Sequence, residues 1–178
     1  MTERGATRLS STESFTGRIF TVTVDRVIVP NGRTITLDMV RHPGSVVLLP
    51  MHDDGRIVLI RQYRYALDRW IWELPAGSLD AGEDPAAAAA RECEEEIGLV
   101  PGRVEFAGAW YPTPGFCTEV MNYYRLGALR ERGADQPPAH RDEDEDIRVH
   151  VFSIGEARAM VRRGEIIDLK TAWGLTLV

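Results

Sequence analysis

Hydrophobic and polar side chains alternate along residues 19–30 (IFTVTVDRVIVP), a pattern of period two that predicts a β-strand. Asn31-Gly32 follows, which is the strongest short signal for a hairpin turn, and residues 33–42 (RTITLDMVRH) supply the return strand. We therefore expect residues 1–43 to form an N-terminal β-hairpin arm that begins with about fifteen loosely ordered residues. Because a lone hairpin is only marginally stable in water, the arm must pack on the main domain or on another subunit.

The next hydrophobic runs are nearly continuous, which is typical of strands buried on both faces of a sheet. Two such strands are expected at residues 45–51 and 56–63, joined by a turn around Asp53, Asp54 and Gly55. Further strands are expected at residues 70–75, 103–111, 120–129 and 147–152.

Capping residues predict three helices. The first begins at Asp84-Pro85 and ends at Gly98, the second begins at Ser153 with Glu156 completing a capping box, and the last runs from Asp168 to about Leu177. Strands and helices are thus mixed in residues 44–178, which indicates an α/β or α+β sandwich with helices packed on a mixed sheet.

Composition and charge narrow the function classes. The 178-residue chain is 44% hydrophobic and 27% charged, as in ordinary soluble globular proteins, and its net charge of −6 argues against a broad basic surface for nucleic acid. No apolar run approaches the roughly 20 residues of a membrane-spanning helix, and no signal peptide is visible. Two cysteines without zinc-binding spacing fit a reduced compartment. We expect a cytoplasmic protein without nucleic-acid or membrane partners.

The most informative stretch is residues 92–96, in which four of five positions are glutamate. On a helix, Glu96 lies about 40° from Glu92 around the axis and Glu95 about 60° to the other side, so three carboxylates share one face. Like charges one turn apart oppose helix formation, which suggests that a cation is expected here. Hard carboxylate oxygens suit Mg²⁺ or Mn²⁺ rather than zinc. Taken alone, the cluster fits a solvated acidic helix face equally well.

The spacing around this cluster matches a signature. Gly77, five residues, Glu83, seven residues and then RECEEEIGL (residues 91–99) resembles the Nudix box, which reads glycine, five residues, glutamate, seven residues, Arg-Glu, apolar, any, Glu-Glu, any, glycine, apolar. Cys93 is a mild departure at an apolar position, since a free cysteine behaves as a small hydrophobe. The resemblance implies a Nudix α/β/α sandwich and metal-dependent hydrolysis of a nucleoside diphosphate linked to another moiety.

The resemblance also implies metal ligands. Glu92 and Glu96 match the main ligands, and Glu95 matches a further ligand or a residue that organises the attacking water. Ala76 matches a position whose backbone carbonyl often completes a metal site. Mg²⁺ is the expected cofactor, with Mn²⁺ as the alternative.

Outside the box, the stretch RQYRYALDRWIWELPAG before it, Pro114 sixteen residues after Gly98, and the later DEDEDIRVHVFS resemble the ADP-ribose pyrophosphatase branch of the family. In this branch a mobile acidic loop carries a general base and a metal ligand, which match Glu143 and Glu145. We favour Glu143 as the base and Glu145 as the ligand, and a small shift of the alignment would exchange them. Without the resemblance, DEDED would be interpreted as a solvated charged loop.

Two groups of residues complete the expected site. Arg91 and Glu83 resemble the pair that orients the catalytic glutamates. The candidates for substrate contacts are Arg64, Arg61, Arg41, Phe20 (or Phe15), Pro114 and Glu119. Some of them have simpler alternatives: Arg64 and Arg61 can be surface charges at a strand end, and the phenylalanines can be core side chains.

Together these features predict a hydrolase that converts ADP-ribose, or a similar nucleoside diphosphate sugar, to AMP and ribose 5-phosphate. The branch is typically homodimeric, with the arm at residues 1–43 exchanged between subunits. The alternatives are a hydrolase for GDP-mannose or another sugar nucleotide, and a ligand-sensing Nudix module without catalysis.

Overall fold

A computed structural model describes residues 5–133 and 146–178 of the chain. Glu143 and Glu145 of the predicted acidic loop lie outside these residues. The chain divides into two compact units, described separately below: Met1–Gly44 with Tyr111–Val120, and Ser45–Trp110 with Met121–Val178.

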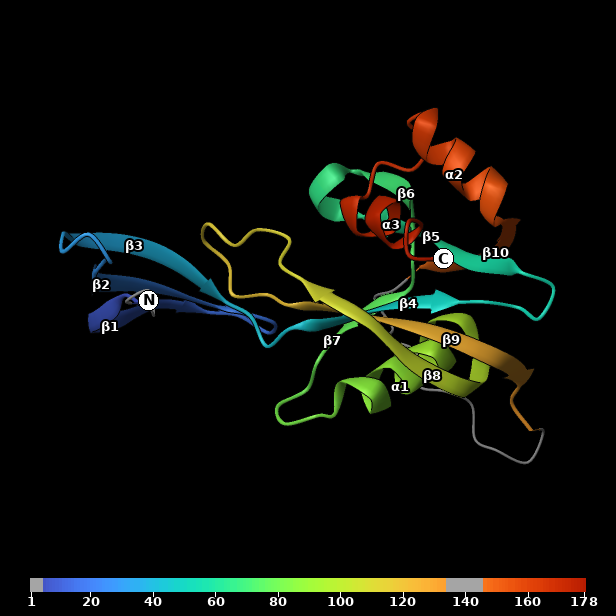
Figure 1. The fold of residues 1–178 in the computed structure, drawn as a ribbon, viewed down its shortest axis with the longest axis horizontal. Coiled ribbons are helices and arrows are strands. Elements are labelled where there is room, and N and C mark those ends of the chain that lie inside the picture. The colour runs from blue at the N-terminus through green and yellow to red at the C-terminus, as the bar shows by residue number, and fades with distance from the viewer. Residues whose placement is uncertain (1–4, 134–145) are drawn as a thin grey trace. The chain divides into compact units, whose positions relative to one another are not determined.

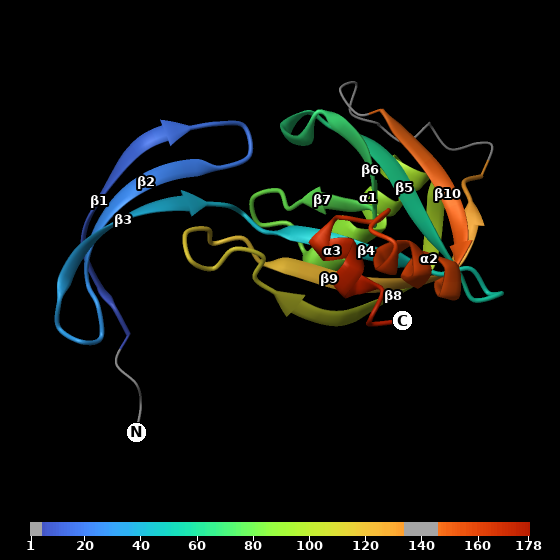
Figure 2. The ribbon, with the colours of Figure 1, turned by 90° about the horizontal axis from the view of Figure 1, so that it is seen from above.

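The first unit contains a three-stranded antiparallel sheet of order β1-β2-β3, visible in Figures 1 and 2. The predicted hairpin is present as β2 (Thr21–Ile28) and β3 (Thr34–Arg41). The expectation of loose order before it is wrong, because β1 (Thr7–Thr16) pairs along β2. Every residue of β1 is exposed. The strand is held by its backbone ladder and by polar side-chain contacts such as the Ser11 hydroxyl, which donates to Asp25 Oδ1 at 2.6 Å. Its side chains carry no apolar periodicity that could have revealed it.

Residues 111–120 join this unit through the last strand of the sheet. The Val40 N–H donates to the carbonyl of Phe116 at 2.7 Å, and the Thr118 N–H donates to the carbonyl of Val40 at 3.0 Å. The unit thus extends beyond the predicted arm at residues 1–43. Its exposed large hydrophobic residues include Leu9, Phe15, Ile19, Phe20 and Ile35. The homodimer, with the arm exchanged, stays a prediction.

The described residues of the second unit form two sheets. The four-stranded sheet has the order β7-β4-β9-β8, in which β4 and β9 are parallel and the other pairs antiparallel. The three-stranded sheet has the order β10-β5-β6 and is antiparallel (Figure 2). The strands are β4 (Ser45–Pro50), β5 (Arg56–Arg64), β6 (Arg69–Glu73), β7 (Ala76–Ser78), β8 (Leu99–Trp110), β9 (Met121–Glu131) and β10 (Ile147–Ser153), with a short 3₁₀ turn at Tyr65–Leu67.

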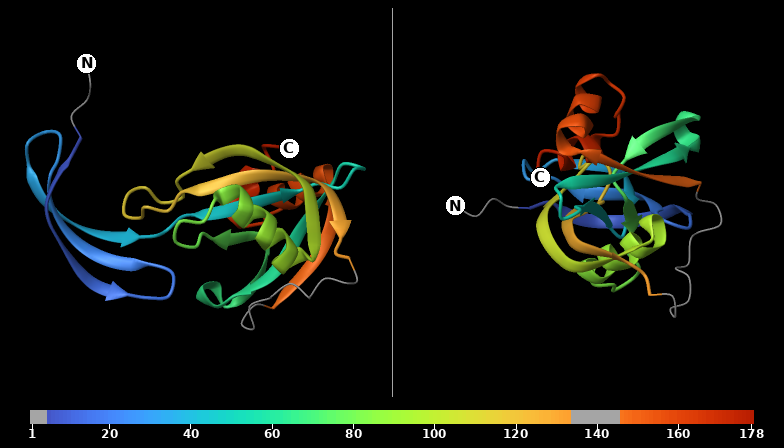
Figure 3. Two further views of the ribbon diagram at one scale, coloured as in Figure 1. Left: turned by 90° about the horizontal axis from the view of Figure 1, so that it is seen from below. Right: turned by 90° about the vertical axis from the view of Figure 1, so that its right-hand side faces the viewer.

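Among the described residues, three helices cover these sheets: α1 (Pro85–Ile97), α2 (Ile154–Arg162) and α3 (Leu169–Gly174). Strand β4 is fully buried and its side chains alternate between two cores. Val46 and Leu48 pack with α1, whereas Val47 and Leu49 pack with residues of α2 and of the C-terminal segment. Figures 1 and 3 show α1 on the opposite side of β4 from α2 and α3. The predicted α/β fold, with helices on both sides of a mixed sheet, is confirmed.

The predicted caps hold the helices in place. Asp84 accepts hydrogen bonds from the backbone of Ala86 and Ala87, Ser153 accepts from Glu156, and Asp168 accepts from Thr171. Gly98 ends α1 with a φ of 74°, the left-handed conformation that favours glycine. Helix α3 ends at Gly174, three residues before the predicted end.

Within residues 5–133 and 146–178, no helix combines the length and the apolar character needed to cross a bilayer.

Two helical glycines allow a matched test of core packing. A Cβ on Gly174 would lie 2.4 Å from Cδ1 of the fully buried Leu74, whereas a Cβ on the exposed Gly155 of α2 would contact nothing within 4 Å. We expect Gly174→Ala to destabilise the protein by about 1–3 kcal/mol through overpacking. Gly155→Ala should stabilise it by roughly 0.4–1 kcal/mol, because alanine loses less backbone entropy on folding. Urea denaturation of both variants measures the difference, and equal effects would contradict it.

Candidate active site

Helix α1 presents the acidic cluster because its opposite side is anchored in the core. Ala88, Ala89, Cys93 and Ile97 are buried against β4, β5 and β9. Burial, with the nearby charges of Glu94 and Glu96, raises the pKa of the Cys93 thiol to about 12, so this side chain is a neutral packing group. The residues next to the anchors, Glu92 and Glu96, are consequently drawn inward and are only 9% and 3% exposed.

Arg91 ties three of the predicted catalytic carboxylates together. Its Nε and Nη2 donate to the two oxygens of Glu83 at 2.9 and 3.0 Å, and its Nη1 donates to Glu92 Oε1 at 2.8 Å and to Glu95 Oε2 at 2.7 Å. The hydrogen bonds to Arg91 lower the pKa of Glu83. The bond to Glu83, with the charges of Glu92 and Glu95, raises the pKa of Arg91. Three carboxylates share one guanidinium, so negative charge remains in excess.

Gly77 provides the space for the Glu92 carboxylate. A Cβ on Gly77 would lie 1.9 Å from Glu92 Oε1 and 2.0 Å from its Cδ. No residue other than glycine fits at this position unless the carboxylate moves. The glycine that begins the sequence signature thus has a steric reason in the structure.

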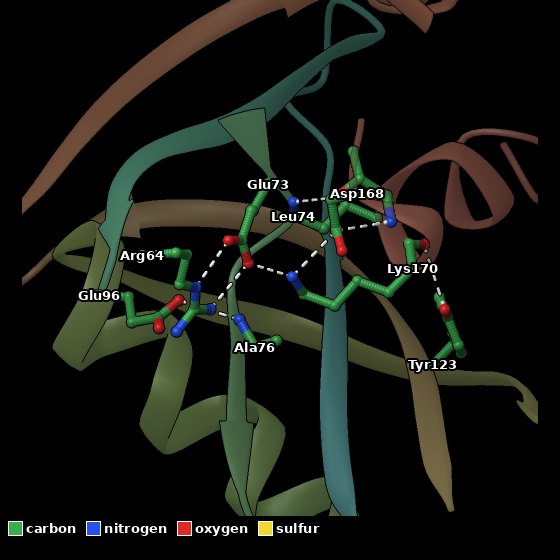
Figure 4. A network of polar contacts seen from close by, with 9 residues as sticks. Arg64, Glu73, Leu74, Ala76, Glu96, Tyr123, Asp168 and Lys170 are labelled. Atoms are coloured by element: carbon green, nitrogen blue, oxygen red, sulfur yellow. Dashed lines mark hydrogen bonds and ion pairs between the residues drawn. The ribbon is translucent and has the colours of Figure 1, made fainter. Parts of the chain in front are cut away.

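Glu96 lies against the short strand β7 and close to Arg64 (Figure 4). Its Oε2 accepts a hydrogen bond from the backbone N–H of Ala76 at 3.0 Å. The sequence predicted a role for the carbonyl of Ala76, and in the structure its N–H is the group that contacts the acidic cluster. The charge of Glu96 also contributes to the raised pKa of Arg64.

Arg64 is held by a buried carboxylate that the sequence analysis missed. Its Nε and Nη2 donate to the two oxygens of Glu73 at 2.7 and 2.8 Å, and Lys170 of α3 contacts the same carboxylate. The Glu73 side chain is 1% exposed. Burial opposes its charged form, but the bonds from Arg64 and the charge of Lys170 outweigh burial and lower the pKa of Glu73. The sequence feature that could have indicated this carboxylate is a glutamate directly after the apolar residues 70–72.

The structure does not bring Arg61 to the acidic cluster. Successive side chains of a strand point to opposite faces, and Arg61 lies over the ring of Trp72, 5.4 Å from its centroid. Gln62 shares the face of Arg64, and its Oε1 is a buried acceptor with no hydrogen-bond partner in the described part of the chain. Gln62 was not among the predicted residues.

The remaining predicted residues lie in the first unit. Phe20 and Phe15 are exposed and their rings are 6.3 Å apart, so neither is a core side chain. Arg41 pairs with the buried Asp25 and donates to Thr23 Oγ1 at 3.3 Å. Pro114 is exposed in the loop that follows β8, and Glu119 closes the same loop. Their substrate contacts stay predictions.

The acidic cluster offers oxygen donors for a metal ion. Among the described residues, no three acidic, histidine or cysteine side chains are arranged to hold one. However, Glu92 and Glu95 converge on one cationic nitrogen of Arg91, and Glu92 lies in a space that Gly77 keeps open. Oxygen donors in this arrangement suit a hard divalent cation. The residues therefore fit such an ion after a local rearrangement of side chains.

Comparisons with known proteins identify the family of this chain. The model of the NUDIX domain matches residues 40–170, so the chain belongs to the NUDIX domain family. An ADP-ribose pyrophosphatase of Mycobacterium tuberculosis (strain ATCC 25618 / H37Rv) is 40% identical over 169 residues, 94% of this chain and 80% of the relative. One of Bacillus subtilis (strain 168) is 34% identical over 170 residues, 94% and 89% of the two chains. A GDP-mannose pyrophosphatase of Citrobacter koseri (strain ATCC BAA-895 / CDC 4225-83 / SGSC4696) is 32% identical over 150 residues, 75% and 76%.

A solved structure shares the fold. The crystal structure of an ADP compounds hydrolase superposes with a TM-score of 0.80 at 20% identity, and the match covers 99% of this chain and 94% of that chain.

The buried Glu73 predicts a specific pH dependence of stability. Glu73→Gln leaves Arg64 and Lys170 facing a neutral amide, so we expect a loss of roughly 3–5 kcal/mol at neutral pH. Because the folded-state pKa lies below the ordinary value of 4.5, wild-type Glu73 stabilises the protein fully above that value and loses this contribution as the pH falls through the folded-state pKa. Urea denaturation should thus show a difference that shrinks in acid.

Glu105→Gln serves as the control. Glu105 is 56% exposed and lies 3.6 Å from Arg103, so its pairing should contribute less than about 1 kcal/mol. A wild-type advantage over Glu73→Gln that stays constant in strong acid would contradict the role given to the Glu73 charge.

Proposed function

We propose that the protein hydrolyses the diphosphate of ADP-ribose, or of a closely similar nucleoside diphosphate sugar, to AMP and ribose 5-phosphate. The observation that carries the proposal is the pair of buried carboxylates, Glu92 and Glu96, on one edge of α1 beside Gly77. Burying two like charges is costly unless a cation or a charged reaction centre requires them. Membership of the NUDIX domain family and the names of the two ADP-ribose pyrophosphatases support this assignment.

The carboxylates of Glu92, Glu95 and Glu96 are the groups proposed to hold Mg²⁺, or alternatively Mn²⁺, together with Glu145 and the backbone at Ala76. When bound, such an ion neutralises phosphate charge and lowers the pKa of the attacking water. The hard oxygen donors of the cluster support this choice of metal.

The other residues of the site have roles that follow from their contacts. Glu83 holds Arg91 by two hydrogen bonds, and Arg91 holds Glu92 and Glu95 in turn, so this pair fixes the carboxylates. Arg64, 40% exposed and anchored on Glu73, can face a phosphate oxygen of the substrate. In the proposed reaction Glu143 accepts a proton from the attacking water, and the water oxygen forms a bond to one phosphorus of the diphosphate. The bond between that phosphorus and the bridging oxygen breaks, and the bridging oxygen leaves as part of the other phosphate.

A second candidate substrate is GDP-mannose, which is supported by the relative of that name. The match to that relative covers less of this chain than the matches to the ADP-ribose pyrophosphatases, so ADP-ribose is preferred. A panel of both compounds, assayed with Mg²⁺ and with Mn²⁺, distinguishes them by the nucleoside monophosphate released.

Glu96→Gln tests the catalytic assignment. The substitution keeps the shape of the side chain and removes a charge from the acidic cluster, so we expect kcat for ADP-ribose to fall at least about 100-fold. Glu94→Gln is the matched control on the same helix, because Glu94 pairs with Arg132 at 3.1 Å and lies outside the cluster. Its kcat should stay near that of the wild type, with product release followed by chromatography.

Two results would contradict the proposal. Unchanged turnover in Glu96→Gln would show that the carboxylate is not catalytic. A wild-type protein that hydrolyses no nucleoside diphosphate derivative with either metal would favour a ligand-sensing module.

Gly77→Ala tests the space beside Glu92. The new methyl group must displace the carboxylate by more than 1 Å, judging from the 1.9 Å approach, and a misplacement of this size costs on the order of 100-fold in rate. Since the clashing atoms are the end of a side chain, the melting temperature should change little. Gly155→Ala, which contacts nothing, is the control for the assay. Wild-type kcat in Gly77→Ala would refute the steric role.

A further inference from the structure

Glu73 and α3 are joined by a closed ring of polar contacts, drawn in Figure 4. Lys170 Nζ contacts Glu73 Oε2 and lies 2.9 Å from Asp168 Oδ2. Thr171 Oγ1 donates to the same Asp168 oxygen at 2.6 Å and accepts from the backbone N–H of Leu74 at 2.7 Å. Leu74 follows Glu73 in the chain, so the ring is complete. It fixes the first turn of α3 on the end of β6.

Lys170 is the single lysine of the chain, and every other residue in the Lys and Arg count is an arginine. Its side chain is 15% exposed. A lysine ammonium is a compact charge that fits between two carboxylates, whereas the planar guanidinium of arginine needs more space. The carbonyl of Lys170 also accepts from the Tyr123 hydroxyl at 3.1 Å, so its backbone is held from β9. Both ends of this residue are therefore fixed.

The contacts of Glu73 divide its negative charge between two cations. Arg64 Nε donates to Glu73 Oε1, while Glu73 Oε2 contacts both Arg64 Nη2 and Lys170 Nζ. Lys170 also pairs with Asp168, so two cations and two carboxylates balance in this network. Lys170 therefore limits how much of the Glu73 charge acts on Arg64, whose guanidinium also lies under the charge of Glu96 on α1.

We propose that Lys170 is a positioning residue for the site, which sets the orientation and the effective charge of Arg64 through Glu73 and so couples α3 to binding of the anionic diphosphate. The inference rests on the proposed function, because it assumes that Arg64 faces a diphosphate. It gives α3 a part in substrate binding, although no residue of α3 is proposed to contact the substrate.

Kinetics on the full chain test this coupling. Lys170→Met keeps the length of the side chain and removes its charge, so we expect KM for ADP-ribose to rise roughly fivefold to tenfold, with a smaller change in kcat. Thr171→Val is the matched control, because it breaks the hydrogen bonds of the Thr171 hydroxyl to Leu74 and Asp168 and leaves all charged groups around Glu73 in place. It should lower the melting temperature and leave KM unaltered.

A double-mutant cycle separates positioning from general destabilisation. If Lys170 acts through Arg64, the effect of Lys170→Met on KM should vanish in an Arg64→Gln background. An effect of the same size in both backgrounds, or the same KM shift in Lys170→Met and Thr171→Val, would overturn the proposal.

A spectroscopic readout is independent of turnover, because ¹⁵N-lysine labelling gives one side-chain signal. Saturating inorganic pyrophosphate should shift the Lys170 Nζ resonance in the wild type and leave it unmoved in Arg64→Gln. A signal that does not respond in the wild type would also overturn the coupling. If ADP-ribose is not hydrolysed but the signal shifts, the proposed function fails and the coupling stands.

Discussion

Burial of negative charge is the constraint on which the rest of this site depends. Glu73, Glu92 and Glu96 are each less than one tenth exposed, and a buried carboxylate is tolerated only when charged or hydrogen-bonding partners surround it. Arginines on two different elements are partners of Glu92 and Glu73, and the backbone N–H of Ala76 donates to Glu96. Arg91 reaches its carboxylates from within α1, and Arg64 reaches Glu73 from β5. Glu92 and Glu96 are buried because neighbouring residues of α1 pack in the core.

Small residues make this packing geometrically feasible. Ala88 and Ala89 let α1 approach β4 and β5 closely, and Gly77 lets a carboxylate lie directly against the backbone of β7. Larger side chains at these positions would separate the helix from the sheet or displace the charges. The alanine run before the glutamates thus serves the geometry of the site as much as the stability of the helix.

Local features of the fold and of the site could be predicted from the sequence, and distant ones could not. The caps at Asp84, Ser153 and Asp168 depend on a few adjacent residues, and the glutamate spacing on α1 depends only on helical periodicity. Lys170 and Glu73, by contrast, are 97 positions apart, and their contact exists only after both sheets and α3 are assembled. The same reason hid the pairing of Val40 with residues 116–118. Strand β1 was missed because all its residues are exposed and its side chains carry no apolar periodicity.

The Cys93 thiol can report when α1, the helix that carries the acidic cluster, separates from the sheet. Its thiol lies beneath α1, fully buried and next to Glu92, and it is protonated at neutral pH because burial raises its pKa. A thiol reagent can reach it only when the helix separates from β4 and β5. Labelling kinetics at Cys93 would therefore report how often α1 opens locally while the rest of the protein stays folded. Cys117, half-buried in the other unit, would react without that event.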